Sequence, residues 1–395
     1  MPERPAIWSV YIHFPFCLHR CAYCDFATVA TRHVPRERYL AAVIAELALR
    51  ARTLTAAPIA TVFFGGGTPS LWGPTAIGSV LGALDRWGGL QTGAEITMEA
   101  NPGTTSTWQP VEYASVGVSR LSIGVQALDD SRLRALDRRH DRAGALGTLR
   151  QVADLLAAGR LQSASADLIF GGPGQTLADL EVDLETVLAL GLPHLSAYGL
   201  TVEAGTPLAE RIDRGLAAPP DEELQSAMLQ LVPSVAERHG LRRYEVSNFA
   251  RPGHESRHNL VYWRGGSYLA LGVSAHGFIA ATDGDDVGTR WGNLRDNDSW
   301  FEAVEAGAEP VEMRESIEAD THVDELLLTG LRLAEGVDLD HLARRVGIAR
   351  RDTLVKRARR AIERGAPIAL QGTRLRVLEP GFQWLDGVIV DLLVS

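Results

Sequence analysis

Cys17-Leu-His-Arg-Cys21-Ala-Tyr-Cys24 holds all three cysteines of this 395-residue chain, in the spacing Cys-x3-Cys-x2-Cys. Thiolates this close together on one loop suit a polynuclear iron site, because each sulfur can reach a different iron of a cubane. A [4Fe–4S] cube has four irons, so three cysteines leave one iron without a protein ligand. The stretch therefore predicts an iron–sulfur cluster with one open corner, where a small molecule can bind and be activated.

Two other chemistries compete for these cysteines. A tetrahedral zinc site needs a fourth ligand, and His13, His19 or His33 is available in the sequence to supply it. Zinc sites, however, usually pair their ligands across two separated knuckles. A disulfide is disfavoured because the count is odd, the spacing is tight and the chain has no cysteine-rich framework. The pattern favours a cluster in a reducing compartment.

The composition is that of an ordinary globular chain. Hydrophobic residues make up 46% of the sequence, and no apolar run reaches the length that spans a bilayer. The N-terminal stretch has no basic region followed by an apolar one, so a signal peptide is not expected. The formal net charge of −10 disfavours broad binding to nucleic-acid phosphates. These features predict a cytoplasmic protein and leave oligomeric state and peripheral membrane contact open.

Short β-branched or aromatic runs alternate with longer segments of helical periodicity. Strands are expected over residues 9–14, 61–64, 95–99, 120–125, 164–170 and 194–200. Helices are expected over 37–52, 76–87, 129–136, 143–158 and 177–190. Alternation at this spacing predicts parallel strands joined by right-handed crossovers. The expected fold class is α/β, with six units forming a partial (β/α)6 barrel of the TIM-like type.

Polar and glycine features stand at the ends of the expected strands. Cys17 follows the first strand, Gly65-Gly66-Gly67 the second and Gln126 the fourth, while Glu99 ends the third and Asp167 lies within the fifth. In parallel barrels the chemistry gathers at the carboxyl ends of the strands. We therefore expect one barrel mouth to collect all five features.

After about residue 215 the alternation changes. A helix is expected over 221–240 and a strand over 242–248, and 250–292 is expected to be irregular structure lining a site. Helices over 316–333, 336–346 and 351–365, followed by strand-like sequence over 367–378, predict a small α+β domain that is winged-helix-like. No nucleic-acid partner is expected, because the chain is acidic and lacks a matching recognition motif. The expected units are 1–240 (partial barrel), 241–310 (barrel extension) and 311–395 (C-terminal domain).

Several polar residues near the strand ends have two interpretations. The glycine run allows the backbone to approach a ligand and to point amide groups at it, although a plain tight turn has the same composition. Asp167 interrupts an apolar strand and must be paired, hydrogen-bonded or bound to a ligand, because unpaired burial is costly. For Asp167 and Glu99, a hydrogen bond in the barrel core stays open beside ligand binding. Gln126 and Arg138 are candidates for hydrogen bonds to a sugar or a carboxylate.

Longer motifs carry a family resemblance. Tyr11-Ile-His-Phe-Pro-Phe-Cys17, the cysteine loop and the Gly-Gly-Gly-Thr-Pro turn resemble radical S-adenosylmethionine proteins. Motifs that begin at Glu99 (Glu-Ala-Asn-Pro-Gly-Thr), Arg120 (Arg-Leu-Ser-Ile-Gly-Val-Gln), Asp167 (Asp-Leu-Ile-Phe-Gly) and His194 (His-Leu-Ser-Ala-Tyr-Gly-Leu) resemble the oxygen-independent coproporphyrinogen III oxidase-like group. The match extends to about residue 300, and the tail resembles the C-terminal domain of that group.

The resemblance implies two cofactors and their ligands. Cys17, Cys21 and Cys24 would bind the [4Fe–4S] cluster, and S-adenosylmethionine would chelate the open iron through its amino and carboxylate groups. The pocket for S-adenosylmethionine would be lined by Tyr11, Tyr23, Gly66, Gly67, Thr68, Glu99, Gln126, Arg138, Asp167 and Gly199. An electron donor is implied if radical chemistry is used.

Two branches of this group differ in function. The oxidase decarboxylates propionate side chains of coproporphyrinogen III in porphyrin biosynthesis. Its pattern has a further cysteine two residues after the third cluster cysteine, where this chain has Phe26, and a longer arm before the first one. Both departures disfavour oxidase activity, which stays the alternative function. Whether the chain is an enzyme is left open.

The other branch is the HemW family of haem chaperones, with the motifs Cys-x-Tyr-Cys-Asp-Phe and His-Asn-x-x-Tyr-Trp. Both motifs are present here, the second as His258-Asn-Leu-Val-Tyr-Trp263. The resemblance implies haem binding and transfer of haem to an unknown acceptor protein. In that interpretation His258 ligates the iron, while Tyr262 and Trp263 pack on the macrocycle.

Simpler interpretations stay open beside this one. The His-Asn-x-x-Tyr-Trp segment has the composition of a core His–Asn turn with two packing aromatics, and His254 and His276 are further candidate ligands nearby. A zinc-stabilised regulatory protein that uses its C-terminal domain is a third class. Metal and sulfide analysis distinguishes that class from a cluster protein.

Overall fold

The computed structural model describes residues 8–103, 109–281 and 286–394. Residues 1–7, part of the N-terminal stretch in which no signal peptide is expected, therefore lie outside the described residues. Thr104, in the motif that begins at Glu99, lies outside them too. Within the described ranges, no helix is both long and apolar enough to cross a bilayer.

Six parallel strands form the centre of the molecule, as the alternating pattern predicts. They are β1 (Trp8–Phe14), β4 (Ile59–Gly66), β5 (Leu90–Ala100), β6 (Arg120–Gln126), β7 (Ser163–Phe170) and β8 (His194–Gly199), and they pair in that order. β11 (Leu269–Leu271) extends the sheet in parallel beside β1. β10 (Asn248–Ala250) and β9 (Arg242–Glu245) extend it antiparallel beside β8. The α/β class with a parallel sheet is confirmed.

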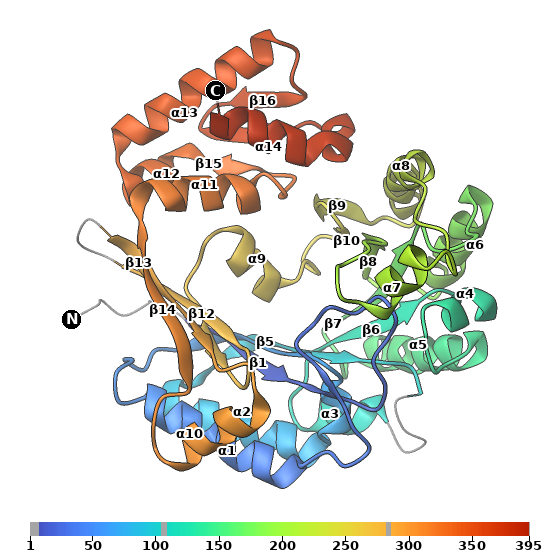
Figure 1. Cartoon of the computed structure of the whole chain (residues 1–395), viewed down its shortest axis with the longest axis vertical. Helices are drawn as coiled ribbons and strands as arrows, with labels where there is room; N and C mark the ends of the chain where they lie inside the picture. The colour runs from blue at the N-terminus through green and yellow to red at the C-terminus, as the bar shows by residue number, and fades with distance from the viewer. Residues whose placement is uncertain (1–7, 104–108, 282–285, 395) are drawn as a thin grey trace.

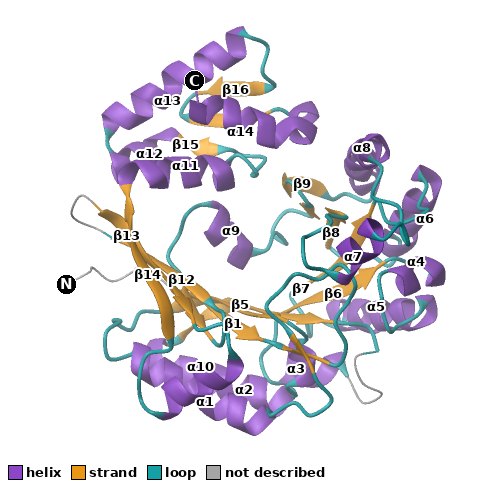
Figure 2. Cartoon of the chain, in the orientation of Figure 1, coloured by secondary structure: helices purple, strands orange, loops and turns teal. Residues whose placement is uncertain are grey.

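Helices cover the outer face of this sheet (Figure 1, Figure 2). They include α1 (Arg36–Arg50), α2 (Pro74–Gly88), α3 (Pro110–Ser115), α4 (Asp130–Ala135), α5 (Arg142–Ala157), α6 (Leu177–Leu188) and α8 (Glu222–Arg238). The strands alternate with period two, as extended backbone must. On β7, Ala164, Ala166 and Leu168 are buried in the main apolar core, whereas Ser165 and Asp167 face the opposite side and line a cavity. The outer side chains thus stabilise the sheet and the inner ones form its polar lining.

The expectation of irregular structure over 250–292 is wrong for much of that segment. It contains the helix α9 (Arg257–Trp263) and the strands β12 (His276–Ala280) and β13 (Asp286–Asn293). β13 pairs with β12 and with β14 (Val311–Glu318) in an antiparallel sheet. Cross-strand pairing outweighs the weak local propensity of these glycine-rich stretches. For the same reason the helix expected from residue 316 begins only after β14, as α11 (Ala319–Gly330).

The C-terminal residues have a second apolar core of their own. It joins α11 to α12 (Leu339–Val346), α13 (Ile348–Glu363) and α14 (Leu385–Val394), with β15 (Val337–Asp338), β17 (Arg374–Val377) and β16 (Ile368–Gln371) paired in that order. In Figure 1 these elements lie across α9 from the parallel sheet. We propose that 1–240 is the barrel, 241–310 its extension and 311–395 the C-terminal unit, whose first strand β14 pairs with β13 of the extension.

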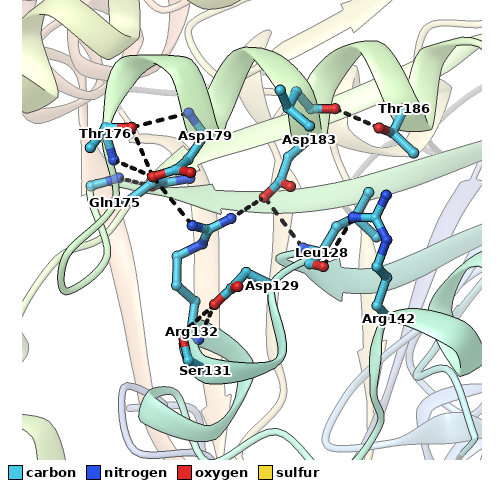
Figure 3. Close-up of polar contacts among 12 residues, drawn as sticks. Leu128, Asp129, Ser131, Arg132, Arg142, Gln175, Thr176, Asp179, Asp183 and Thr186 are labelled. Atoms are coloured by element: carbon cyan, nitrogen blue, oxygen red, sulfur yellow. Dashed lines mark hydrogen bonds and ion pairs between the residues drawn. The ribbon is translucent and has the colours of Figure 1, made fainter.

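A buried ion pair holds α4 against α6 (Figure 3). Arg132 donates from Nη2 to Asp183 Oδ2 at 3.1 Å, and these side chains are only 11% and 5% exposed. Asp183 also accepts from the backbone N–H of Leu128 at 3.3 Å. The turn after α4 carries Arg138, whose N–H donates to the Leu133 carbonyl at 2.8 Å. The pair therefore positions the segment that brings Arg138 toward the cysteine loop.

We expect Arg132→Met to lower the free energy of unfolding by about 3 kcal/mol at neutral pH, because Asp183 is left buried without its cation. Burial already raises the pKa of Asp183, and loss of Arg132 raises it further. A group with a raised native pKa binds more protons folded than unfolded, so stability falls as pH rises. The destabilisation measured by chemical unfolding should therefore shrink as pH is lowered toward 4.

The double variant Arg132→Met with Asp183→Asn should recover part of the lost stability. Arg238→Met is the matched control, because Arg238 bridges Glu181 and Glu185 at the surface. Little change is expected there. An equal loss in both single variants would contradict a special role for the buried pair.

Candidate functional site

The cysteine loop is tied to the barrel mouth at both ends and in its middle. β2 (Phe16–Cys17) pairs with β3 (Val29–Ala30), which closes the loop. In the middle, Ala22 donates to the Leu136 carbonyl at 3.2 Å and accepts from the Leu208 N–H at 2.9 Å. A small apolar cluster that includes Ala22, Leu136 and Leu208 packs there. The loop is thus a positioned element, although it contains little regular structure.

Thr68 and Arg138 are among the side chains that donate hydrogen bonds to cysteine sulfurs. Thr68 Oγ1 donates to Cys17 Sγ, and Arg138 Nη1 donates to Cys21 Sγ, each at 3.4 Å. Burial raises the pKa of Cys17 to about 11 against the smaller opposing effect of Thr68, and burial also raises the pKa of Cys24. A metal cluster must therefore displace protons when it binds these thiols.

The three sulfurs share one loop without forming a mononuclear site. In the described part of the chain, no three His, Cys, Asp or Glu side chains are grouped to hold a single metal ion. A cubane does not need such convergence, because each thiolate binds a different iron. The donor set of three half-buried cysteines with N–H and O–H donors beside them fits a [4Fe–4S] cluster.

The glycine run brings β4 against the start of the cysteine loop. Its amide groups are already used: Gly66 donates to Glu99 Oε2 at 3.1 Å, Gly67 to the Phe14 carbonyl at 2.7 Å and Thr68 to the Phe16 carbonyl at 3.0 Å. A Cβ at position 67 would lie 2.7 Å from the Phe16 oxygen, so only glycine allows this approach. These three amides are therefore bonded within the protein, and the close approach of the glycine backbone to a ligand stays a prediction.

Arg138 is held at the carboxyl end of β6. Its Nη2 donates to the Gly124 carbonyl at 2.6 Å and to Asn101 Oδ1. Gln126 adopts a left-handed backbone, with φ of 66°. A Cβ at Gly124 would lie 2.8 Å from both Asn101 Oδ1 and Gln126 Nε2, so glycine leaves room for these polar groups. Asn101, which follows β5, and Gly124 of β6 therefore hold the Arg138 guanidinium beside Cys21.

Two carboxylates line the same cavity, Glu99 on β5 and Asp167 on β7. Asp167 accepts from Ser122 Oγ at 2.7 Å and from Ser165 Oγ at 2.9 Å. Burial, followed by the negative charge of Asp167, raises the pKa of Glu99 to about 8 against the opposing Gly66 N–H. Burial raises the pKa of Asp167 too, although hydroxyl donors oppose it. A positively charged ligand between these carboxylates would relieve their mutual repulsion.

One cavity of about 450 Å³ collects most of the expected site residues. Its lining includes Cys17, Cys21, Cys24, Tyr23, Gly66, Gly67, Thr68, Glu99, Gln126, Arg138, Asp167 and Gly199. Tyr11 is not part of this lining; its hydroxyl lies 3.0 Å from His13 Nδ1. Phe26, where the oxidase pattern has cysteine, is 60% exposed and lines the cavity mouth.

Sequence reasoning missed several residues that line this cavity or support it. They are Asn101, Ser122, Ser165, Ser196 and Arg120 in the lining, and His13 beneath Gly66. Asn101 follows Glu99 by two residues in the quoted motif. Ser165 lies two residues before Asp167 on β7, so the two side chains are on the same face of the strand. Counting with period two from Asp167 would therefore have predicted Ser165.

The His-Asn-x-x-Tyr-Trp motif forms α9, which lies between the sheet and the C-terminal unit in Figure 1. Glu95 fixes its first turn, accepting from the N–H groups of Arg257 at 3.2 Å and His258 at 3.0 Å. The ring of His258 is fully buried, with Nδ1 2.8 Å from Thr61 Oγ1 and Nε2 2.7 Å from the Tyr262 hydroxyl. Burial lowers the pKa of His258 to about 3, so the imidazole is neutral.

The haem candidates do not line the cavity that holds the cysteines. Ser256 and Asn259, at the start of α9, do line it. Trp263, at the other end of α9, lines a second cavity. Of the other candidate ligands, His254 Nδ1 lies 3.2 Å from Ser163 Oγ, and His276 begins β12.

The fold and the cysteine loop define a radical S-adenosylmethionine protein, and residues 11–187 match the model of the Radical SAM superfamily. Residues 317–384 match the HemN C-terminal domain. Among similar proteins, "Heme chaperone HemW" of Mycobacterium tuberculosis H37Rv is 37% identical over 100% of this chain and 96% of its own length. "Heme chaperone HemW" of Synechocystis is 35% identical over 83% and 79%. The chain belongs to the HemW family.

A mitochondrial protein and a solved structure are also similar to this chain. "Radical S-adenosyl methionine domain-containing protein 1" of Danio rerio is 34% identical over 86% of this chain and 76% of its own. Coproporphyrinogen III oxidase (HemN) from Escherichia coli has a TM-score of 0.81 at 20% identity, covering 100% of this chain and 91% of that one. At this identity the likeness shows the fold. Membership of the superfamily implies a [4Fe–4S] cluster and S-adenosylmethionine as cofactors.

We expect Glu99→Gln to change the proton balance of S-adenosylmethionine binding. At pH 7, Glu99 with a pKa of about 8 is mostly protonated, and a cationic ligand favours its ionised form. The wild type should therefore release up to about one proton more than the variant. Calorimetry in two buffers of different ionisation enthalpy measures this difference. The amine of the ligand contributes equally in both proteins.

Glu112→Gln, at the start of α3, is the matched control and should release as many protons as the wild type. The same proton release in Glu99→Gln and the wild type would show that Glu99 does not face the ligand's charge.

Proposed function

We propose that this chain is a haem chaperone that holds a [4Fe–4S] cluster and S-adenosylmethionine, binds haem and passes it to an acceptor protein. The observation that carries the proposal is the cavity whose lining brings the three cysteines together with Arg138, Glu99 and Asp167. The relatives named heme chaperone, similar over most of the chain, support the haem part. Oxidase activity is the reaction that the test below must exclude.

Cys17, Cys21 and Cys24 would hold the cluster, and the remaining expected residues of the cavity would orient S-adenosylmethionine. When bound, the cluster and S-adenosylmethionine supply one-electron chemistry. Glu99 and Asp167 offer negative charge to the ammonium and sulfonium groups. Arg138 offers positive charge and hydrogen bonds to the cluster sulfur and to the ligand carboxylate. Tyr11 would not contact S-adenosylmethionine directly; it would position His13 through the hydrogen bond between its hydroxyl and His13 Nδ1.

His258 is the proposed iron ligand, with Tyr262 and Trp263 beside the macrocycle. Its neutral imidazole is the form that binds iron. Both ring nitrogens are engaged in the described conformation, so the Tyr262 side chain, which lies four residues along the same helix, must rotate away to free Nε2. We propose a cytoplasmic location, an unidentified haem acceptor, and an electron donor if radical chemistry is used.

One anaerobic experiment tests the proposal. Reconstituted protein is incubated with haem, and separately with coproporphyrinogen III, S-adenosylmethionine and reductant. We expect a stable haem complex that transfers haem to an apo-acceptor such as apomyoglobin, and no decarboxylated product. Formation of protoporphyrinogen IX would contradict the chaperone function.

Variants identify the ligand. His258→Ala should lose the haem absorption spectrum of the wild type, while His254→Ala and His276→Ala should keep it. Loss of the spectrum in either of these two, with His258→Ala unchanged, would move the iron ligand to that histidine.

A further inference from the structure

A second cavity, of about 340 Å³, lies between the end of α9 and the C-terminal unit. This size falls within the range of small-molecule sites. Trp263, Leu326, Leu333 and Val337 give it apolar walls, and its other lining residues include Gly266, Gly330 and Gly336. A Cβ at Gly330 would lie 2.7 Å from Val337 and one at Gly336 2.1 Å from the Leu375 oxygen, so glycine is required at both positions.

The lining of this cavity is cationic. It holds Arg264, Arg344, Arg345 and Arg374 against Glu335 and Asp338, and His341 stands beside them. Glu335 lies 2.9 Å from Arg264 and 3.7 Å from Arg374, and Asp338 lies 3.8 Å from Arg374. These two carboxylates are therefore committed to Arg264 and Arg374. The excess positive charge lies on α12, at Arg344 and Arg345.

Two side chains in the lining have buried donor atoms without acceptors. Within the described structure, Trp263 Nε1 and the Nε and Nη2 atoms of Arg345 are buried and have no hydrogen-bond partner. Buried donors without partners cost free energy, and a buried guanidinium without an anion costs more. Burial accordingly lowers the pKa of Arg345. An anion with several acceptor oxygens would satisfy all three donors.

The cavity thus combines an indole and aliphatic wall with donors for an anion. This combination suits a flat apolar molecule whose edge carries carboxylates. α9 connects the cavity to the haem candidates: on this short helix Tyr262 directly precedes Trp263, and His258 lies five residues before it. A carboxylate edge held at Trp263 therefore leaves the body of the ligand directed along α9.

We propose that this second cavity receives the propionate edge of haem, with Arg345 and Trp263 donating to one carboxylate and Arg344 next to it. The inference rests on the proposed haem function and adds the element that recognises the ligand's acidic edge. The C-terminal unit is then part of the haem site, because α12 supplies Arg344 and Arg345.

Three porphyrins test the proposal by absorbance and fluorescence titration: haem, iron-free protoporphyrin IX and haem dimethyl ester. Arg345→Met and Trp263→Phe should each weaken haem and protoporphyrin IX about tenfold or more, since a hydrogen bond to a charged group is lost. The diester, which has no carboxylates, should bind Arg345→Met as it binds the wild type, and Trp263→Phe should weaken the diester less than it weakens haem. Arg359→Met, at an exposed position of α13, is the matched control and should change nothing.

The outcomes separate this inference from the haem function itself. Wild-type binding of haem and protoporphyrin IX by both folded variants overturns the inference and leaves the chaperone function intact. Failure of the wild type to bind any porphyrin overturns both. Thermal unfolding is measured for every variant. If Arg345→Met does not fold, Arg345→Lys replaces it. We expect Arg345→Lys to lose part of the affinity for protoporphyrin IX. An unchanged affinity would count against the proposal.

Discussion

Replacement of Cys21 by alanine is expected to abolish cluster assembly, with iron falling from about four per chain in the reconstituted wild type to below about one. The chain has no other cysteine to substitute for a lost ligand. The Arg138 guanidinium, which donates to the Cys21 sulfur at 3.4 Å, would then face a methyl group. Iron and acid-labile sulfide analysis, together with the charge-transfer absorbance of the cluster, measure the result.

Val29→Ala is the control in the same loop. Val29 is 42% exposed and lies outside the cavity lining, although its backbone pairs with Phe16. Its iron content should equal that of the wild type. A Cys21→Ala protein that keeps a full complement of iron and sulfide would refute the assignment of the three cysteines as the cluster ligands. Zinc without sulfide in the wild type would refute the cluster altogether.

Gly66→Ala is expected to destabilise the barrel mouth by about 3 kcal/mol or more, from backbone strain of about 1–3 kcal/mol and overpacking of a similar size. Gly66 has φ of 107°, and an added Cβ would lie 2.5 Å from the His13 ring. His13 Nε2 lies 2.9 Å from the carbonyl oxygen of Ala27 in the cysteine loop. Displacement of His13 should therefore loosen the loop, and iron uptake should fall together with stability.

Gly73→Ala separates the two causes. Gly73 also has positive φ, of 95°, but a Cβ there would meet nothing within 4 Å. This control should show the backbone cost alone, with normal iron uptake. Chemical unfolding of the two variants under the same conditions gives the comparison. Equal destabilisation would mean that the contact with His13 contributes nothing.

The barrel could be predicted from the sequence because its strands and helices have strong local periodicity. Each of the six expected strands lies within or close to an observed one, and errors at the boundaries are a few residues. The segment from β12 to β14 could not be predicted in this way. Its strands are stabilised by pairing with one another, as at Phe278 and Arg290, and this pairing has no signature in a single strand.

The candidate site was predictable where a residue type is rare at its position. Cysteine, glycine and carboxylate at strand ends have few structural explanations, and these residues now line one cavity. Burial and hydrogen bonding are not readable from spacing, however. The sequence gives no sign that His258 is enclosed by Thr61 and Tyr262, or that the glycine-run amides are used within the protein.

Side chains alternate between the two faces of each strand, and this alternation separates positions that can be substituted from positions that cannot. On β7 the residues facing the helices, such as Ala166, hold the sheet to its outer layer, while Ser165 and Asp167 face the cavity. Substitution of an inward serine alters the chemistry offered to a ligand and leaves the outer packing untouched. A barrel built this way can diverge toward a new task at its inner positions while its outer positions stay constant. That division explains how a chain only 20% identical to an oxidase keeps the same fold.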